Sequence, residues 1–142
     1  MSLVVDASIA IAWCVEAEQT PAIMALLDRV GEEGAEAPAL WPLEAANTLV
    51  MLSRRKRLSA EQRDDQIAFL RDLPVALDDA TATQAWGATA ILAERHRLSV
   101  HDAAYLELAL RRDLPLATLD EGLRKAAVQA GVSVVPLESA RR

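Results

Sequence analysis

Four acidic side chains in this sequence stand at positions where carboxylates can do chemistry together. Asp6 ends a short apolar run, and Asp120 follows another one late in the chain. Glu44 comes two residues after a proline, and Asp102 comes three residues after a serine. Carboxylate oxygens are the ligands that hard divalent cations such as Mg²⁺ and Mn²⁺ prefer. If these four acids meet, they predict a magnesium site, with manganese as the alternative ion.

Short apolar runs alternate with longer helical patterns, and this alternation indicates which elements position the acids. The apolar runs predict strands at residues 3–5, 35–37, 75–77, 114–118 and 132–135. Periodicity and capping signals predict helices over about 8–15, 20–32, 42–55, 79–95 and 121–130, and two more that begin at residues 59 and 99. Strands separated by helices form a parallel sheet with helices on both faces, so we expect one α/β domain over residues 1–142.

The predicted strands bring the acids to one rim of the sheet. Ligands of such a sheet gather at the carboxyl ends of its strands. Asp6 and Asp120 are delivered to that rim by the strands that they follow. Glu44 and Asp102 lie in first turns of helices, and first turns that leave the rim point back towards it. The four carboxylates are therefore expected to converge.

Each acid also has an ordinary structural explanation. Aspartate is a preferred helix N-cap, which accounts for Asp6 and Asp120. The helix dipole favours acids in a first turn, which accounts for Glu44 and Asp102. A cap contributes about 1 kcal/mol, whereas two carboxylates about 4 Å apart repel by about 4 kcal/mol at an effective dielectric of about 20. A cluster of four therefore needs a cation, or some of its members must be protonated.

Composition narrows the class of protein. Zinc favours histidine or thiolate ligands, and His96, His101 and Cys14 are scattered. A single cysteine forms no internal disulfide and favours a reducing, cytoplasmic setting. No apolar stretch approaches the roughly 20 residues of a membrane helix, and the first residues do not have the features of a signal peptide. The net charge of −6 means that RNA would have to be held by local basic patches and a bridging cation.

Four segments, in this order and at this spacing, give the chain a family resemblance. They are Val5-Asp6-Ala7-Ser8, Trp41-Pro42-Leu43-Glu44-Ala45-Ala46-Asn47, Leu98-Ser99-Val100-His101-Asp102-Ala103-Ala104-Tyr105, and Leu116-Ala117-Thr118-Leu119-Asp120. No segment is specific alone, but together they span essentially the whole chain. The sequence resembles the PIN-domain ribonucleases, and in particular the toxin of VapBC toxin–antitoxin pairs.

The resemblance implies a three-layer α/β/α sandwich around a five-stranded parallel sheet, and a Mg²⁺-dependent endoribonuclease activity. It assigns the acidic quartet to Asp6, Glu44, Asp102 and Asp120, and the supporting hydroxyls to Ser8 and Thr118. It further implies a homodimer, and an RNA substrate that is often transfer RNA or another structured RNA. A VapB-type antitoxin is expected to insert a tail into a groove beside the acids.

The roles within the quartet are only partly separated by the sequence. Asp6 and Asp102 are expected to bind the ion directly, and Glu44 and Asp120 directly or through water. Either Glu44 or Asp120 is the expected acceptor of a proton from the attacking water. Such an attack leaves a 5′-phosphate and a 3′-hydroxyl.

Several polar residues have both a functional and a structural interpretation. Asn47 lies one turn beyond Glu44 on the same helical face, where it either touches the site or is solvated. Basic residues are candidates for RNA contact or are solvated helix ends. They are the run Arg54, Arg55, Lys56 and Arg57, and the pairs around Arg95–Arg97 and Arg111–Arg112. We expect no catalytic role for six others: core or subunit packing for Trp13, Trp41 and Trp86, helix-face packing for Cys14 and Tyr105, and a surface position for His101.

Two other functions compete with the nuclease. A phosphotransfer protein also places aspartates at strand ends. A dehalogenase-type phosphotransferase usually has a second aspartate where this chain has Ser8, and a receiver domain needs a lysine after a late strand. The only lysines, Lys56 and Lys125, do not occupy such a place. A catalytically silent binding module with the same fold is the stronger alternative, and loss of metal-dependent cleavage on Asp6→Asn would distinguish the two.

Overall fold

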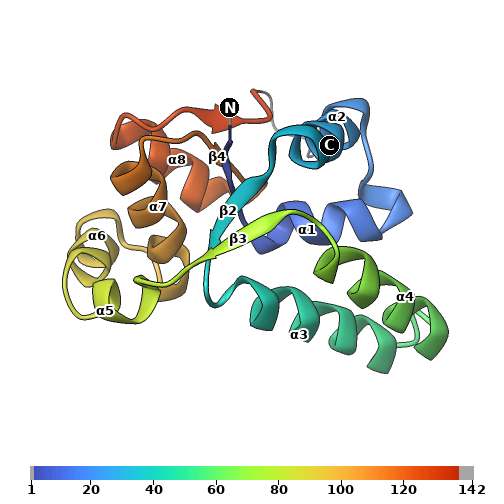
Figure 1. Cartoon of the computed structure of the whole chain (residues 1–142). Coiled ribbons are helices and arrows are strands. Elements are labelled where there is room, and N and C mark those ends of the chain that lie inside the picture. The colour runs from blue at the N-terminus through green and yellow to red at the C-terminus, as the bar shows by residue number, and fades with distance from the viewer. Residues whose placement is uncertain (1, 138–142) are drawn as a thin grey trace.

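The computed structural model describes residues 2–137, and its elements follow the predicted alternation of strands and helices (Figure 1). The strands are β1 (Val4–Val5), β2 (Ala35–Pro38), β3 (Val75–Asp78), β4 (Leu116–Ala117) and β5 (Val134–Val135). The helices are α1 (Ala7–Cys14), α2 (Pro21–Glu33), α3 (Trp41–Arg54), α4 (Ala60–Arg71), α5 (Thr81–Ala85), α6 (Ala88–His96), α7 (Val100–Arg112) and α8 (Glu121–Gln129), with a 3₁₀ turn, η1, at Glu16–Glu18.

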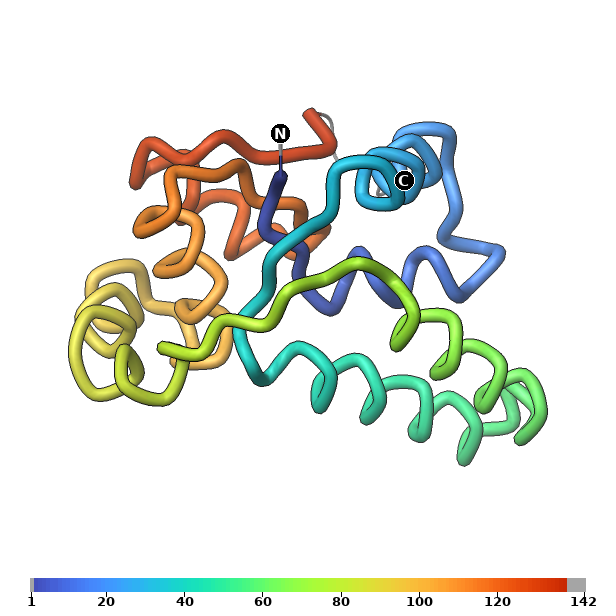
Figure 2. The backbone as a smooth tube through the Cα atoms, viewed as in Figure 1, coloured from blue at the N-terminus to red at the C-terminus, as the bar shows by residue number. Residues whose placement is uncertain are grey.

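The strands form one parallel sheet in the order β3-β2-β1-β4-β5. Helices α6, α7 and α8 lie on one side of the sheet and α1, α2 and α4 on the other (Figure 2). This arrangement confirms the predicted α/β fold with its five-stranded sheet. The connections reverse direction beside β1, since β2 lies on one side of it and β4 on the other. In open parallel sheets that position is the usual ligand crevice.

The strands at the centre of the sheet are shorter than the sequence patterns predict, but hydrogen bonds extend beyond them. The Asp6 N–H donates to the Ala117 carbonyl at 3.1 Å, and the Thr118 N–H donates to the Val135 carbonyl at 3.1 Å. Backbone hydrogen bonds therefore hold the residues that follow β1 and β4 side by side. Side chains of β1 and the first helices complete a buried core, including the fully enclosed Leu3, Val4 and Ile9.

The predicted helix over residues 79–95 is wrong as a single element. It consists of α5 and α6, separated at Trp86 and Gly87. Gly87 has φ −132° and ψ −104°, outside the helical region, and glycine is the poorest helix former apart from proline. Trp86 is 91% exposed at this break, so of its two expected places the core is excluded and a subunit contact stays a prediction, whereas Trp13 and Trp41 are buried as expected.

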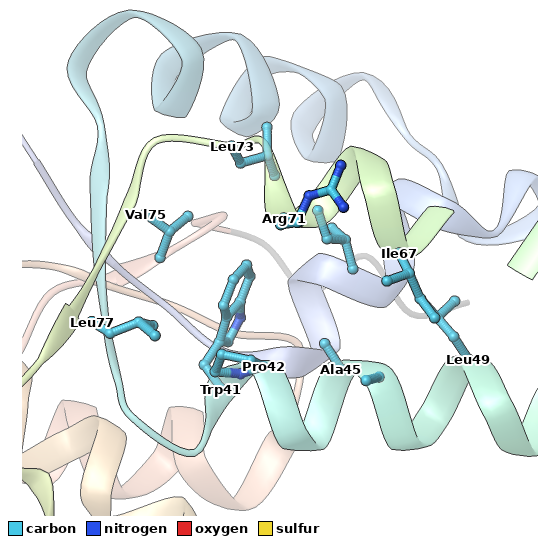
Figure 3. Close-up of a pocket in the computed structure, with 11 residues that line it drawn as sticks. Trp41, Pro42, Ala45, Leu49, Ile67, Arg71, Leu73, Val75 and Leu77 are labelled. Atoms are coloured by element: carbon cyan, nitrogen blue, oxygen red, sulfur yellow. The ribbon is translucent and has the colours of Figure 1, made fainter. Parts of the chain in front are cut away.

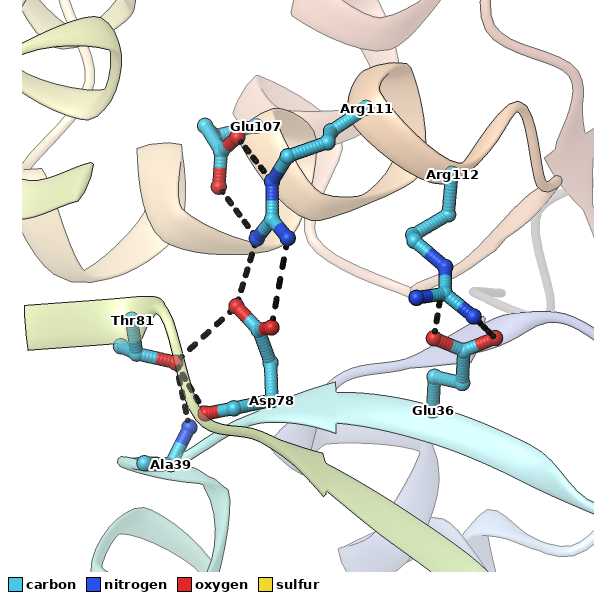
Figure 4. Close-up of polar contacts among 7 residues, drawn as sticks. All are labelled: Glu36, Ala39, Asp78, Thr81, Glu107, Arg111 and Arg112. Carbon is cyan, nitrogen blue, oxygen red and sulfur yellow. Dashed lines mark hydrogen bonds and ion pairs between the residues drawn. The ribbon is translucent and has the colours of Figure 1, made fainter. Parts of the chain in front are cut away.

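Ion pairs bind helix α7 to the strands β2 and β3 (Figure 4). Arg111 contacts Asp78 at the end of β3 at 2.5 Å and also contacts Glu107, one turn back on α7, at 2.8 Å. Arg112 contacts Glu36 on β2 at 3.3 Å. Both guanidinium groups are thus part of the scaffold, a role that neither interpretation of this pair, RNA contact or solvated helix end, included. None of the helices described between residues 2 and 137 is long and apolar enough to cross a membrane.

We expect Arg111→Met to lower the free energy of unfolding by about 3 kcal/mol, because it leaves two buried carboxylates without a cation. The side chains of Glu107 and Asp78 are only 6% and 9% exposed. Arg112→Met is the matched control, since its ion pair is far more exposed and should contribute no more than about 1 kcal/mol. Urea unfolding of both variants measures the difference, and equal losses would contradict the assignment.

Candidate metal site

Asp6 is the most buried of the four predicted acids, only 5% exposed at the end of β1. It caps α1, with Oδ1 accepting hydrogen bonds from the Ile9 N–H at 3.1 Å and from the Ser8 hydroxyl at 2.6 Å. Burial, with a smaller contribution from the charge of Asp120, raises the pKa of Asp6 to about 6 despite these donors. Capping therefore explains how Asp6 is held but does not relieve its charge.

Two hydroxyl groups connect Asp6 to the segment that follows β4. Thr118, fully buried, donates to Asp6 Oδ2 and accepts from the Asp120 N–H at 3.0 Å. Ser8 donates to Asp6 and accepts from the Leu119 N–H at 2.9 Å. The structure thus brings both predicted hydroxyls into contact with the carboxylate that they were expected to support.

Glu44 reaches the same rim from α3. That helix begins at Trp41, whose indole Nε1 donates to the Asp6 carbonyl at 3.2 Å, and Pro42 in the first turn suits a helix start. Glu44 is half-buried, and its Oε1 accepts a hydrogen bond of 2.5 Å from the Tyr105 hydroxyl. The sequence analysis missed this contact, because it assigned Tyr105 to ordinary helix-face packing. The available signal was its spacing, since Tyr105 lies three residues after Asp102 on the same face of α7.

Asp102 and Asp120 lie at the starts of their helices, as predicted. The N–H of Asp102 donates to the N-cap Ser99, and its half-buried side chain has a raised pKa, first through burial and then through the charges of Asp120 and Glu44. Asp120 is exposed and caps α8, with Oδ2 accepting from the Leu123 N–H at 2.8 Å.

Two of the four acids, Asp6 and Asp102, have pKa values that the charges of the others raise. The charge of Asp120 acts on both Asp6 and Asp102, and the charge of Glu44 acts on Asp102. Within residues 2–137, however, no three His, Cys, Asp or Glu side chains stand close enough together to form a ready-made metal cage. The donors are all carboxylate oxygens, which suits a hard divalent ion such as Mg²⁺. The site therefore fits such an ion by charge and donor type, and ligation would draw the side chains together.

The other predicted polar residues lie outside this group. Asn47 is exposed one turn beyond Glu44, and His101 is exposed as expected. The run Arg54, Arg55, Lys56 and Arg57 is exposed at the opposite end of α3. Ten residues separate Glu44 from Arg54, which corresponds to about 15 Å along a helix. The basic run is too far from the acids to touch the same phosphate.

An apolar groove of about 320 Å³ begins one turn from Glu44 (Figure 3). It runs between α3, α4 and the edge strand β3, and its lining includes Trp41, Leu49, Ile67, Leu73, Val75 and Leu77. Trp41 belongs to both places, because its ring lines the groove while its Nε1 donates to Asp6.

Comparison with known proteins gives the following relatives. The family model of the PIN domain matches residues 3–129. Among solved structures, the chain is similar to PAE2754 from Pyrobaculum aerophilum (22% identity, TM-score 0.69, covering 95% of this chain and 90% of that one). It is also similar to VapBC2 from Rickettsia felis bound to a DNA fragment from their promoter (12% identity, TM-score 0.66, covering 94% of this chain and 97% of that one). A further similar structure is FitAcB from Neisseria gonorrhoeae (18% identity, TM-score 0.60, covering 94% of this chain and 96% of that one). At these identities the structures show the fold alone. No curated protein matches the chain.

The pH dependence of stability tests the burial of Asp6. Its pKa rises from an ordinary 3.8 to about 6 on folding, so between these values the folded chain holds a proton that the unfolded chain releases. The free energy of unfolding contributed by this group therefore falls as pH rises from about 4 to about 6. We expect Asp6→Asn to remove this fall and to stabilise the metal-free protein near neutral pH by up to about 3 kcal/mol.

Urea unfolding in EDTA at a series of pH values measures this effect. Asp65→Asn, which changes an exposed acid on α4, is the control and should leave the pH dependence unchanged. If Asp6→Asn instead lowers stability near neutral pH, the cap of α1 matters more than the buried charge.

Proposed function

Because the chain belongs to the PIN domain family, we propose that it is a Mg²⁺-dependent endoribonuclease, the toxin component of a VapBC-type toxin–antitoxin module. The observation that carries the proposal is the buried Asp6 carboxylate, whose pKa is raised within reach of the charge of Asp120. Burial does not improve a helix cap, whereas it strengthens the attraction between a carboxylate and a bound cation. Mn²⁺ is the expected substitute ion.

In this proposal the four acids of the rim have different roles in phosphodiester hydrolysis. Asp6 and Asp102 would hold the ion, with Glu44 and Asp120 binding it directly or through water. When bound, the ion would supply Lewis-acid polarisation of the scissile phosphate and help to ionise the attacking water. Glu44 or Asp120 would orient that water and accept its proton. The products would be a 5′-phosphate and a 3′-hydroxyl.

Ser8 and Thr118 act in this proposal through Asp6. Their hydroxyls donate to the two different oxygens of its carboxylate, so they set the direction in which it faces. Both are held in turn by backbone N–H groups of the segment after β4. Partners of a metal ligand typically contribute 10-fold to 100-fold in affinity or activity, an order-of-magnitude range.

The RNA substrate, transfer RNA or another structured RNA, would contact the protein at two separate places. Its scissile phosphate would lie at the acidic rim, where the cation offsets the net charge of −6. The exposed run Arg54 to Arg57 would hold the backbone at a distance along α3. A substrate that extends past the cleavage point by several nucleotides is needed to reach both.

The groove between α3, α4 and β3 is the proposed place for the tail of a VapB-type antitoxin. Its lining is mostly apolar, as expected for a surface that takes an amphipathic or extended segment. It begins one turn from Glu44, so a bound tail lies beside the acids. A homodimer is part of the same proposal, and the exposed Trp86 is an apolar side chain that a contact between two copies would cover.

A catalytically silent PIN-fold binding module is the second candidate. It is favoured by the absence of a ready-made cluster of three ligands within residues 2–137 and by the capping contacts of Asp6 and Asp120. Such a module would bind RNA with equal affinity with or without Mg²⁺ and would leave it intact.

We expect Asp102→Asn to lower the Mg²⁺-dependent cleavage of RNA by about 100-fold or more, because an anionic ligand that would hold the ion is lost. Cleavage is measured by mapping new 5′-phosphate ends in total cellular RNA treated with the purified protein. Asp65→Asn, with its exposed carboxylate on α4, should cleave as the wild type does. Wild-type protein that binds RNA but produces no new ends would favour the binding module.

A second test concerns the groove. Leu77→Glu should weaken inhibition by the antitoxin, encoded in the short reading frame expected beside the gene, by at least about 10-fold, because an unpaired carboxylate would be buried on binding. Leu77 is 47% exposed, so the free protein should fold and cleave RNA normally. Val128→Glu places the same charge on the exposed side chain of Val128 in α8, outside the groove, and should be inhibited normally. Equal inhibition of both variants would place the tail elsewhere.

A further inference from the structure

The hydroxyl of Tyr105 makes a contact at the rim that the proposed mechanism does not use. Tyr105 is 1% exposed, among the most enclosed side chains of the described core. Its ring lies in α7, and its hydroxyl donates to Glu44 Oε1 in α3 at 2.5 Å, across 61 residues of sequence. A buried phenol needs a hydrogen-bond partner. Here that partner is a carboxylate of the rim, which makes a short, charge-assisted bond.

The surroundings of the hydroxyl show that it points towards the acids. The charges of Glu44, Asp6 and Asp102 all raise the pKa of Tyr105, after burial as the largest cause. The phenol therefore stays protonated and acts as a donor. It lies one turn from Asp102 on the same face of α7. Its bond to Glu44 thus joins the two helices that carry the two half-buried acids.

We propose that Tyr105 is a positioning residue that holds Oε1 of Glu44 and directs Oε2 towards the cation site. This inference rests on the proposed metal-dependent nuclease. Glu44 is the longest of the four acidic side chains and has the most rotamers to lose. It also faces the charge of Asp102, which would drive it towards solvent in the absence of a donor. The Tyr105 hydroxyl opposes that repulsion before any ion arrives.

The arrangement also indicates how Glu44 contacts the ion. One of its oxygens is occupied by a short hydrogen bond, so contact through Oε2 alone, directly or through water, is favoured over contact through both oxygens. Asp6 is also held by hydroxyls but differs from Glu44, since each of its two oxygens accepts a hydrogen bond, one from Ser8 and one from Thr118. Hydroxyl donors from three different segments, Ser8 in α1, Tyr105 in α7 and Thr118 after β4, therefore orient the carboxylates of Asp6 and Glu44.

Tyr105→Phe tests this inference, because it removes the hydroxyl and keeps the ring. We expect the dissociation constant for Mn²⁺, measured by titration calorimetry, to rise by about 10-fold, and kcat for RNA cleavage to fall by 10-fold to 100-fold, an order-of-magnitude range, with little change in KM. Thr89→Val is the matched control, since it removes another buried hydroxyl, in α6, that is not among the donors to Asp6 and Glu44. It should leave both quantities unchanged.

A double-mutant cycle separates positioning from general loosening of the structure. In a Glu44→Ala background there is no carboxylate to hold, so Tyr105→Phe should not weaken Mn²⁺ binding further. An equal effect of Tyr105→Phe in both backgrounds would overturn the inference, as would unchanged Mn²⁺ affinity in the single variant. If the wild-type protein itself neither binds Mn²⁺ nor cleaves RNA, the proposed function fails and this inference fails with it. Normal wild-type behaviour with an unaffected Tyr105→Phe variant rejects the positioning role alone.

Discussion

A carboxylate removed from water must be given donors, a cation or a proton, and Asp6 at the end of the central strand faces this constraint. Two hydroxyls and a backbone N–H surround it, yet burial still raises its pKa to about 6. Those donors come from α1 and from the segment after β4, so the same contacts hold the sheet rim together. The local fold and the proposed chemistry therefore depend on one buried charge.

The ion pairs that hold the scaffold together involve carboxylates other than that of Asp6. Arg111 and Arg112 neutralise Asp78, Glu107 and Glu36 on β3, α7 and β2. These contacts hold α7, which carries Asp102, against β2 and β3, the two strands on one side of β1. The rim acids Asp6 and Glu44 receive hydroxyl donors instead of guanidinium groups. Such donors orient a carboxylate while leaving its negative charge available to a cation.

Patterns that depend on neighbouring residues could be predicted from the sequence, whereas contacts between distant helices could not. The strand positions, the helix that begins at Ser59 and the PIN family follow from local spacing and motifs, and all are confirmed. The break at Gly87 was missed because the apolar spacing on either side continues without interruption. The partner of Tyr105 lies 61 residues away, and only the packing of α7 against the rim brings the two together. The catalytic roles of the acids stay predictions.

Trp41 lines the apolar groove with its ring and holds the carbonyl of Asp6 with its nitrogen. A residue that makes both of these contacts tolerates few substitutions. If the groove takes an antitoxin tail, as proposed, a change at Trp41 that alters the fit of the tail would disturb the acidic rim at the same time. In that case partner preference would change with less cost at other lining residues, such as Leu73 and Leu77, than at Trp41.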